Sequence, residues 1–101
     1  MFPTADQIAT AIVAACRLTG DLPFATCMRQ PSRARAVAMA ALIEVFPDAR
    51  RIGIARCCGL VTPANVSPIL AAARAAKWWR DDWVEEVVGL LVADSYGEQG
   101  R

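Results

Sequence analysis

Glycine and proline divide this chain into short segments in which apolar residues recur at helical spacing. Gly20, Pro31, Pro47 and Gly59 stand where such segments begin or end, and both residue types disfavour the continuation of a helix. β-branched residues do not alternate with polar ones as they do in strands. The apolar fraction of 55%, much of it alanine, suits closely packed helices. The sequence therefore predicts an all-α fold, a compact bundle of about five to six helices.

Two helices are marked in the first half of the chain. Thr4 and Gln7 have the spacing of a capping box, in which each side chain bonds an otherwise unpaired backbone N–H. Gly20 ends this first helix, because glycine adopts the left-handed conformation easily. A second helix is predicted from a cap at Ser32 to about Phe46. Its apolar surface is wide, so it is expected to be the buried central helix.

Two more helices joined by a turn are predicted in the second half of the chain. Asp48 is expected to cap a helix that stops at Gly59. The following helix extends to about Trp79 and begins either at Thr62-Pro63 or at Ser67-Pro68. Each pair combines a capping side chain with a proline at the first helical position, and the sequence leaves the choice between them open.

Asp81 and Asp82 mark the start of a final helix that is predicted to end at about Ser95. A brief helix over residues 24–28 is also predicted. Residues 1–95 are therefore expected to form a single helix-turn-helix domain, and residues 96–101 a flexible tail.

The sequence shows no segment typical of export or membrane insertion. The longest apolar stretch, 84–93, contains Glu85 and Glu86 and is too short to cross a bilayer. The N-terminal residues lack the cationic lead and apolar core of a signal peptide. A cytoplasmic protein is expected.

The cysteine pattern argues against a disulfide framework and against a zinc site. Cys16, Cys27, Cys57 and Cys58 are irregularly spaced, and the chain has no histidine. Reduced, mostly buried thiols are expected instead. A cysteine nucleophile would lack its usual histidine base, and no glycine-rich phosphate loop is present. We therefore expect no enzymatic activity, metal or cofactor.

Charge is distributed unevenly along the chain. Residues 29–80 carry nine cations against two carboxylates, whereas residues 81–101 carry one cation against six carboxylates. A basic middle is typical of a segment that meets phosphates, although ordinary solvated faces also produce such a pattern. The cations of the middle segment are Arg29, Arg33, Arg35, Arg50, Arg51, Arg56, Arg74, Lys77 and Arg80.

The segment 54–66 has the form of a helix-turn-helix. A short helix ends at a glycine, and a capped second helix follows. In such a motif the second helix enters the major groove of DNA while the first crosses the backbone. Many helix pairs share this pattern, so by itself it is weakly specific.

A second stretch narrows the interpretation. The run Arg33-Ala34-Arg35-Ala36-Val37-Ala38-Met39 resembles the Arg-Pro-Arg-Gln-Ile-Ala-Met sequence that leads into the C-terminal, Trp repressor-like DNA-binding domain of the bacterial replication initiator DnaA. In that family an amphipathic helix and a basic loop precede the run, and an Ile-Gly-Arg-x-Phe-Gly turn follows it. Residues 8–18, 29–35 and 54–59 occur here in the same order. The resemblance covers residues 5–79 and rests on order and spacing rather than on identities.

The resemblance implies a DnaA-like DNA-binding domain without the initiator's own specificity. The family residues that read the initiator's DNA site are replaced here by Val61, Thr62, Pro63, Ala64 and Asn65, and the chain has no nucleotide-binding domain. Bacterial transcription activators, including those that control gene transfer agents, resemble this arrangement. The resemblance therefore implies a nucleoid-associated transcriptional regulator that binds DNA.

Three groups of side chains are candidates for contact with double-stranded DNA. Loop arginines suit phosphates or a narrow minor groove. Short polar groups near the start of the recognition helix suit phosphates or base edges, although helix capping explains two of them, the threonine and the serine, equally well. Cations on the two motif helices suit phosphates, and two of them, three residues apart, share a helical face. The groups are Arg29, Arg33 and Arg35; Thr62, Asn65 and Ser67; and Arg50, Arg51, Arg56, Arg74 and Lys77.

The last helix is more apolar than one core-facing side requires. Val84, Val87 and Leu91 belong to one stripe, and Trp83, Val87 and Leu90 form a second. The second stripe either closes the core or provides a surface for a homodimer or a protein partner, since exposed apolar groups beside tryptophan favour association. The alternative function is therefore a helical module that binds RNA polymerase or another regulator without direct DNA contact.

Overall fold

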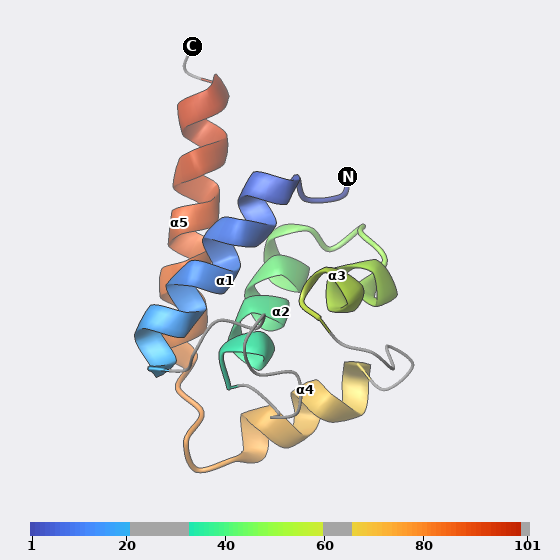
Figure 1. The fold of residues 1–101 in the computed structure, drawn as a ribbon, viewed down its shortest axis with the longest axis vertical. Coiled ribbons are helices and arrows are strands. Elements are labelled where there is room, and N and C mark those ends of the chain that lie inside the picture. The colour runs from blue at the N-terminus through green and yellow to red at the C-terminus, as the bar shows by residue number, and fades with distance from the viewer. Residues whose placement is uncertain (21–32, 60–65, 100–101) are drawn as a thin grey trace.

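The fold is an all-helical bundle in which five helices cover most of the described chain. It is seen in a computed structural model that describes residues 1–20, 33–59 and 66–99, with side chains as far as Ala93. No strand occurs within these ranges. The all-α prediction is confirmed. The helices, drawn in Figure 1, are α1 (Ala5–Thr19), α2 (Arg33–Val45), α3 (Arg51–Cys57), α4 (Val66–Ala75) and α5 (Asp81–Gln99).

α2 is the central helix, as the sequence predicts. It packs against each of the other four helices, with α1 and α5 against each other on one side and α3 and α4 against each other on another. Eight of its residues are buried, and five of these are alanines, which let neighbouring helices approach closely. The largest fully buried side chains come from α2, α3 and α5 and from the residue that follows α3: Met39, Leu42, Val37, Ile54, Val87, Leu91 and Cys58.

Local capping defines α1 at both ends. The Thr4 hydroxyl accepts a hydrogen bond from the Gln7 backbone N–H at 3.2 Å, and the Gln7 side-chain oxygen accepts one from the Thr4 N–H at 2.8 Å. Gly20 closes the helix at φ 77°, and its N–H donates to the Cys16 carbonyl. The predicted capping box and glycine stop are both confirmed.

The predicted cap of α3 is wrong, whereas its predicted end is confirmed. Asp48 is exposed within a turn, and the cap position is Arg50, whose side chain makes no capping bond. The Ala49 N–H bonds the Phe46 carbonyl, so the chain turns after Pro47 before the helix can start. α3 ends at Cys57, and Gly59 adopts the left-handed φ of 85°.

The structure places α4 between the two predicted starts and ends it early. The helix begins at Val66, so Pro68 falls in the first turn, where a missing N–H removes no helical bond. It ends at Ala75 instead of near Trp79. Backbone bonds from Ala76 to the Ala73 carbonyl and from Trp79 to the Ala76 carbonyl make turns there, and Trp79 packs against the core.

α5 extends beyond its predicted end at Ser95 to Gln99, so residues 96–99, assigned to the tail, are helical. Its far end projects past the rest of the bundle (Figure 1). No helix among the described residues has both the length and the apolar character required to cross a bilayer. The brief helix predicted over 24–28 lies outside the described residues.

The two apolar stripes of α5 have different surroundings. Val84, Val87 and Leu91 belong to the core. Trp83 is half-buried against the core, and Leu90 is 47% exposed. Because Val87 is fully buried, it cannot contribute to the partner surface that the sequence suggested around it.

Alanine substitutions of Val87 and of Leu90 test whether the first is a core position of α5 and the second a surface position. Val87→Ala is expected to lower the free energy of unfolding by about 1–3 kcal/mol, because it leaves a cavity. Leu90→Ala is expected to change it by less than about 0.5 kcal/mol. Urea denaturation followed by circular dichroism measures both, and equal losses in the two variants would contradict the described packing.

Candidate nucleic-acid interface

Three arginines at the start of α3 and along it are exposed. Arg50 precedes the helix, Arg51 begins it and Arg56 lies near its end, and all three are exposed. The sequence from Ala49 to Arg80 contains no carboxylate. We call Arg50, Arg51, Arg56 and the exposed Ser67 of α4 the α3–α4 face.

A side-chain hydrogen bond joins the two helices of this face. The Arg51 Nη1 donates to the Ser67 Oγ at 3.4 Å, which links the first turn of α3 to the first turn of α4. A guanidinium has five N–H donors in a planar fork, so this bond leaves donors for a phosphate group. The starts of the two helices, where backbone N–H groups lack helical partners, therefore lie near each other.

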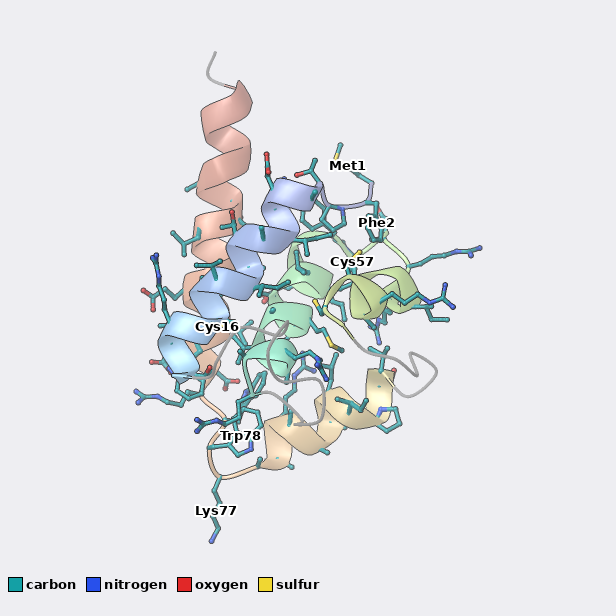
Figure 2. The ribbon with its side chains drawn as sticks, in the orientation of Figure 1. Met1, Phe2, Cys16, Cys57, Lys77 and Trp78 are labelled. Carbon is teal, nitrogen blue, oxygen red and sulfur yellow. The ribbon has the colours of Figure 1, made fainter. Side chains whose placement is uncertain are left out.

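The N-terminal segment lies against the outer side of α3. A β-carbon on Gly53 would be 2.8 Å from Cε2 of Phe2, so the absence of a side chain there makes room for the aromatic ring. Figure 2 shows Phe2 beside this helix, of which Cys57 is the last residue. The three arginines remain exposed around this contact.

Arg33 and Arg35, which the sequence assigns to DNA contact, are half-buried and bond helix ends. The Arg33 Nη2 donates to the Thr19 carbonyl at 3.0 Å, at the last residue of α1. The Arg35 Nε donates to the Cys58 carbonyl at 3.0 Å, at the end of α3. Carbonyls at helix C-termini lack intrahelical donors and carry partial negative charge, so cations stabilise them. Both arginines thus join α2 to its neighbours.

The sequence contained a signal for these two bonds. Gly20 and Gly59 mark helix ends, and each end leaves carbonyls that need donors. The resemblance to the DnaA family instead predicted that Arg33 and Arg35 contact DNA. Only the tertiary arrangement shows which arginine reaches which helix end.

The structure separates Arg74 and Lys77, which the sequence placed on one helical face. α4 ends at Ala75, so Lys77 lies in the turn beyond it. Its side chain extends away from the bundle (Figure 2). Arg74 lines an open pocket of about 300 Å³ together with three carboxylates, and these make its surroundings unfavourable for a phosphate. The carboxylates are Glu44, Asp81 and Glu85.

The outward side of α4 offers almost no hydrogen-bonding side chains. Pro68, Ala71, Ala72 and Ala75 are exposed there, and Ser67 is the exposed polar residue at the start. Side chains without donors or acceptors can contact only the methyl group of thymine in the major groove. Arg29, Thr62 and Asn65, the remaining candidates, lie outside the described residues.

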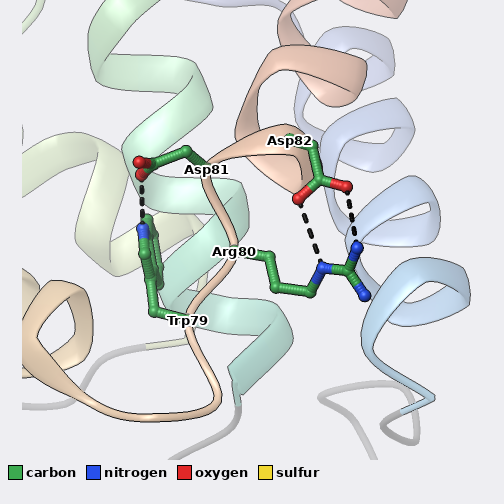
Figure 3. A network of polar contacts seen from close by, with 4 residues as sticks. All are labelled: Trp79, Arg80, Asp81 and Asp82. Atoms are coloured by element: carbon green, nitrogen blue, oxygen red, sulfur yellow. Dashed lines mark hydrogen bonds and ion pairs between the residues drawn. The ribbon is translucent and has the colours of Figure 1, made fainter.

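Polar contacts hold the connection between α4 and α5. The Trp79 Nε1 donates to an Asp81 carboxylate oxygen at 2.8 Å, and Arg80 makes two bonds of 3.3 Å to Asp82 (Figure 3). The Arg80 guanidinium also lies 5.8 Å from the centre of the Trp83 ring. This arginine is therefore neutralised locally and contributes little to a cationic surface.

The cysteines at the end of α3 have contrasting environments. Cys57 is exposed, Cys58 is buried and Cys16 is half-buried, and no disulfide joins any two of these three; Cys27 lies outside the described residues. The sequence predicted that the thiols are mostly buried, and Cys57 is an exception. Burial raises the pKa of the Cys58 thiol to about 12, with the neighbouring Cys57 adding to the effect and Arg35 opposing it. Cys58 is therefore protonated at neutral pH.

No protein-family model, curated protein or solved structure matches this chain. The interpretation of the α3–α4 face consequently depends on its own geometry and charge.

Arg35 and Arg56 are a matched pair for testing a structural arginine against a surface arginine. Arg35→Met is expected to lower the free energy of unfolding by about 1–3 kcal/mol, because the Cys58 carbonyl loses a charged donor. Arg56→Met is expected to change it by less than about 0.5 kcal/mol. Urea denaturation distinguishes the two, and an Arg35 variant as stable as the Arg56 variant would show that the Cys58 bond adds nothing.

The adjacent thiols should differ in reactivity. At pH 8, iodoacetamide is expected to alkylate the exposed Cys57 in the folded protein and to leave Cys58 unmodified, because the Cys58 thiol is buried and keeps its proton. Urea should make both reactive. Single Cys57→Ser and Cys58→Ser variants, read by mass spectrometry, assign the sites; equal rates in the folded protein would show that Cys58 is not buried.

Proposed function

We propose that this chain is a DNA-binding transcriptional regulator that contacts double-stranded DNA through the α3–α4 face, in the manner of a DnaA-like helix-turn-helix. The observation that carries the proposal is the presence of three exposed arginines at and along α3, one of which, Arg51, bonds Ser67 at the start of α4. Guanidinium groups bind phosphates through paired N–H donors.

The contacts in this proposal are mainly to phosphates. Arg50, Arg51 and Arg56 lie at and along the helix that, in a helix-turn-helix, crosses the DNA backbone. The exposed alanines of α4 carry no groups that read base edges. Any hydrogen-bonded recognition of sequence therefore falls to the start of the recognition helix, at Ser67 and the candidates Thr62 and Asn65.

The charge distribution gives the bound molecule an orientation. Asp81, Asp82, Glu85 and Glu86 are exposed on the first half of α5, and α5 packs on the side of α2 that carries α1. Phosphates repel this acidic helix and attract the arginines of α3. DNA is therefore expected to approach α3 and the start of α4, and not the end of α4, where Arg74 shares a pocket with Asp81 and Glu85.

Salt dependence tests the proposal directly. The protein is titrated onto a fluorescent duplex at salt concentrations between 50 and 200 mM, and the logarithm of affinity is plotted against the logarithm of salt concentration. In the variant that carries both Arg51→Ala and Arg56→Ala, the slope should fall by about 1.8, since each phosphate contact contributes about 0.9. Affinity should fall on every duplex sequence, because phosphate contacts are independent of sequence.

Arg80→Ala is the control, because it removes one positive charge from an exposed arginine that is already paired with Asp82. It should leave the slope nearly unchanged. A wild-type protein that does not bind duplex at 50 mM salt, or a double variant with the wild-type slope, would contradict the proposal.

The second candidate function is protein recognition without DNA contact. The exposed, alanine-rich side of α4 favours it, because small side chains let another helix pack closely. The partner in that case would be RNA polymerase or another regulator. Ala72→Arg separates the two functions: an added cation should strengthen duplex binding or leave it unchanged, whereas it should disrupt packing of a partner helix on this side.

A further inference from the structure

An open groove with an apolar floor runs between α1 and α5. It has a volume of about 490 Å³ and is lined by Asp6, Ala9, Thr10, Val13, Ala14, Arg17 and Leu90. Val13 and Leu90 are 49% and 47% exposed, although both are large apolar residues. Apolar side chains that face a groove together favour contact with another molecule.

The residues that α1 contributes form a stripe along its exposed side. Asp6, Thr10, Val13 and Arg17 are spaced by four, three and four residues, so they share one side of the helix. The opposite side contains Ala11 and Ala15, which are fully buried. The stripe thus begins with a negative side chain, ends with a positive one, and has its apolar part between them.

This order of charges is complementary to itself. Asp6 and Arg17 are about 16 Å apart along the helix, at 1.5 Å per residue. If two α1 helices pack antiparallel about a two-fold axis between residues 11 and 12, Asp6 of each copy faces Arg17 of the other. Val13 then faces Thr10, and the small Ala9 allows the helices to come close.

The two charged side chains are available for such pairing. Both Asp6 and Arg17 are exposed, and neither has an ion pair or side-chain hydrogen bond with another residue in the described part of the chain. Two ion pairs at the ends of the contact would fix its antiparallel direction, because a parallel arrangement places like charges together. Leu90 of α5 borders the groove and adds apolar area.

We propose that the α1–α5 groove is a self-association surface whose occupant is α1 of a second copy of this chain. The contact differs from the stripe of Trp83, Val87 and Leu90, because Val87 is buried. It leaves the α3–α4 face accessible, since α3 and α4 pack on a different side of α2. The proposal stands independently of DNA binding.

Two charge reversals test the antiparallel pairing. Asp6→Arg makes both ends of the stripe positive, and Arg17→Asp makes both ends negative. Each variant alone repels its own copy, so its dimer dissociation constant should rise at least tenfold above that of the wild type. An equimolar mixture of the two variants restores both pairs, and it should form a heterodimer with an affinity near the wild-type value. Sedimentation equilibrium over a range of concentrations measures all three samples.

The apolar part of the groove is tested with Val13→Glu, for which Ile52→Glu is the control. Ile52 is 48% exposed on α3, which matches Val13 in exposure but lies outside the groove. Val13→Glu should give a monomer, and Ile52→Glu should dimerise like the wild type. Circular dichroism verifies that each variant is folded.

A wild-type protein that sediments as a monomer up to about 1 mM overturns the proposal, as do charge-reversed variants that remain dimeric or fail to pair when mixed. If a different protein occupies the groove, the wild type is monomeric and Val13→Glu loses only that partner, which also overturns it. The Arg51 and Arg56 double alanine variant should remain dimeric, so failure of DNA binding is distinguishable from failure of self-association.

Discussion

The burial of α2 among the other four helices is the constraint on which this structure depends. Its alanines form a narrow core helix that α1, α3, α4 and α5 can all approach. Arg33 and Arg35 add direction to this packing, because their bonds to the Thr19 and Cys58 carbonyls fix where the ends of α1 and α3 lie. Dispersion contacts alone lack such directionality. Two charged side chains near the start of one helix thus position two others.

This arrangement gives the bundle two sides with different chemistry. The side formed by α3 and α4 carries exposed arginines and exposed alanines, and it supports the proposal of phosphate binding. The side formed by α1 and α5 carries an apolar groove, which supports the proposal of self-association. The acidic start of α5 borders the end of α4, where Asp81 and Glu85 line a pocket with Arg74. The two surfaces are separated by α2, so occupation of one does not sterically block the other.

The sequence predicts those features of the fold that depend on short-range bonds. The Thr4–Gln7 capping box, the stops at Gly20 and Gly59 and the central position of the second helix could all be derived from neighbouring residues. These features arise from local hydrogen bonding and from the width of an apolar surface.

The failures come from contacts between distant residues. Asp48 has the character of a cap, but the turn after Pro47 moves the helix start past it. No neighbouring residue predicts that α4 ends before Trp79; the helix ends at Ala75, and Trp79 packs against the core. The sequence alone does not show that the end of α3 lies beside Arg35 and supplies a carbonyl for it. The prediction that Arg35 contacts DNA rested on the family resemblance. The exposed arginines of α3 could be predicted from the sequence, since no carboxylate occurs from Ala49 to Arg80.

The small size of the α2 side chains also limits how this protein can evolve. A larger residue at Ala38 or Ala41, both fully buried, would have to be accommodated by shifts in the residues packed around it, because α2 is enclosed by the other four helices. Compensating changes would therefore have to arise together. The exposed side of α1 faces no such requirement, so substitutions there can change its surface while the helix at the centre keeps its alanines.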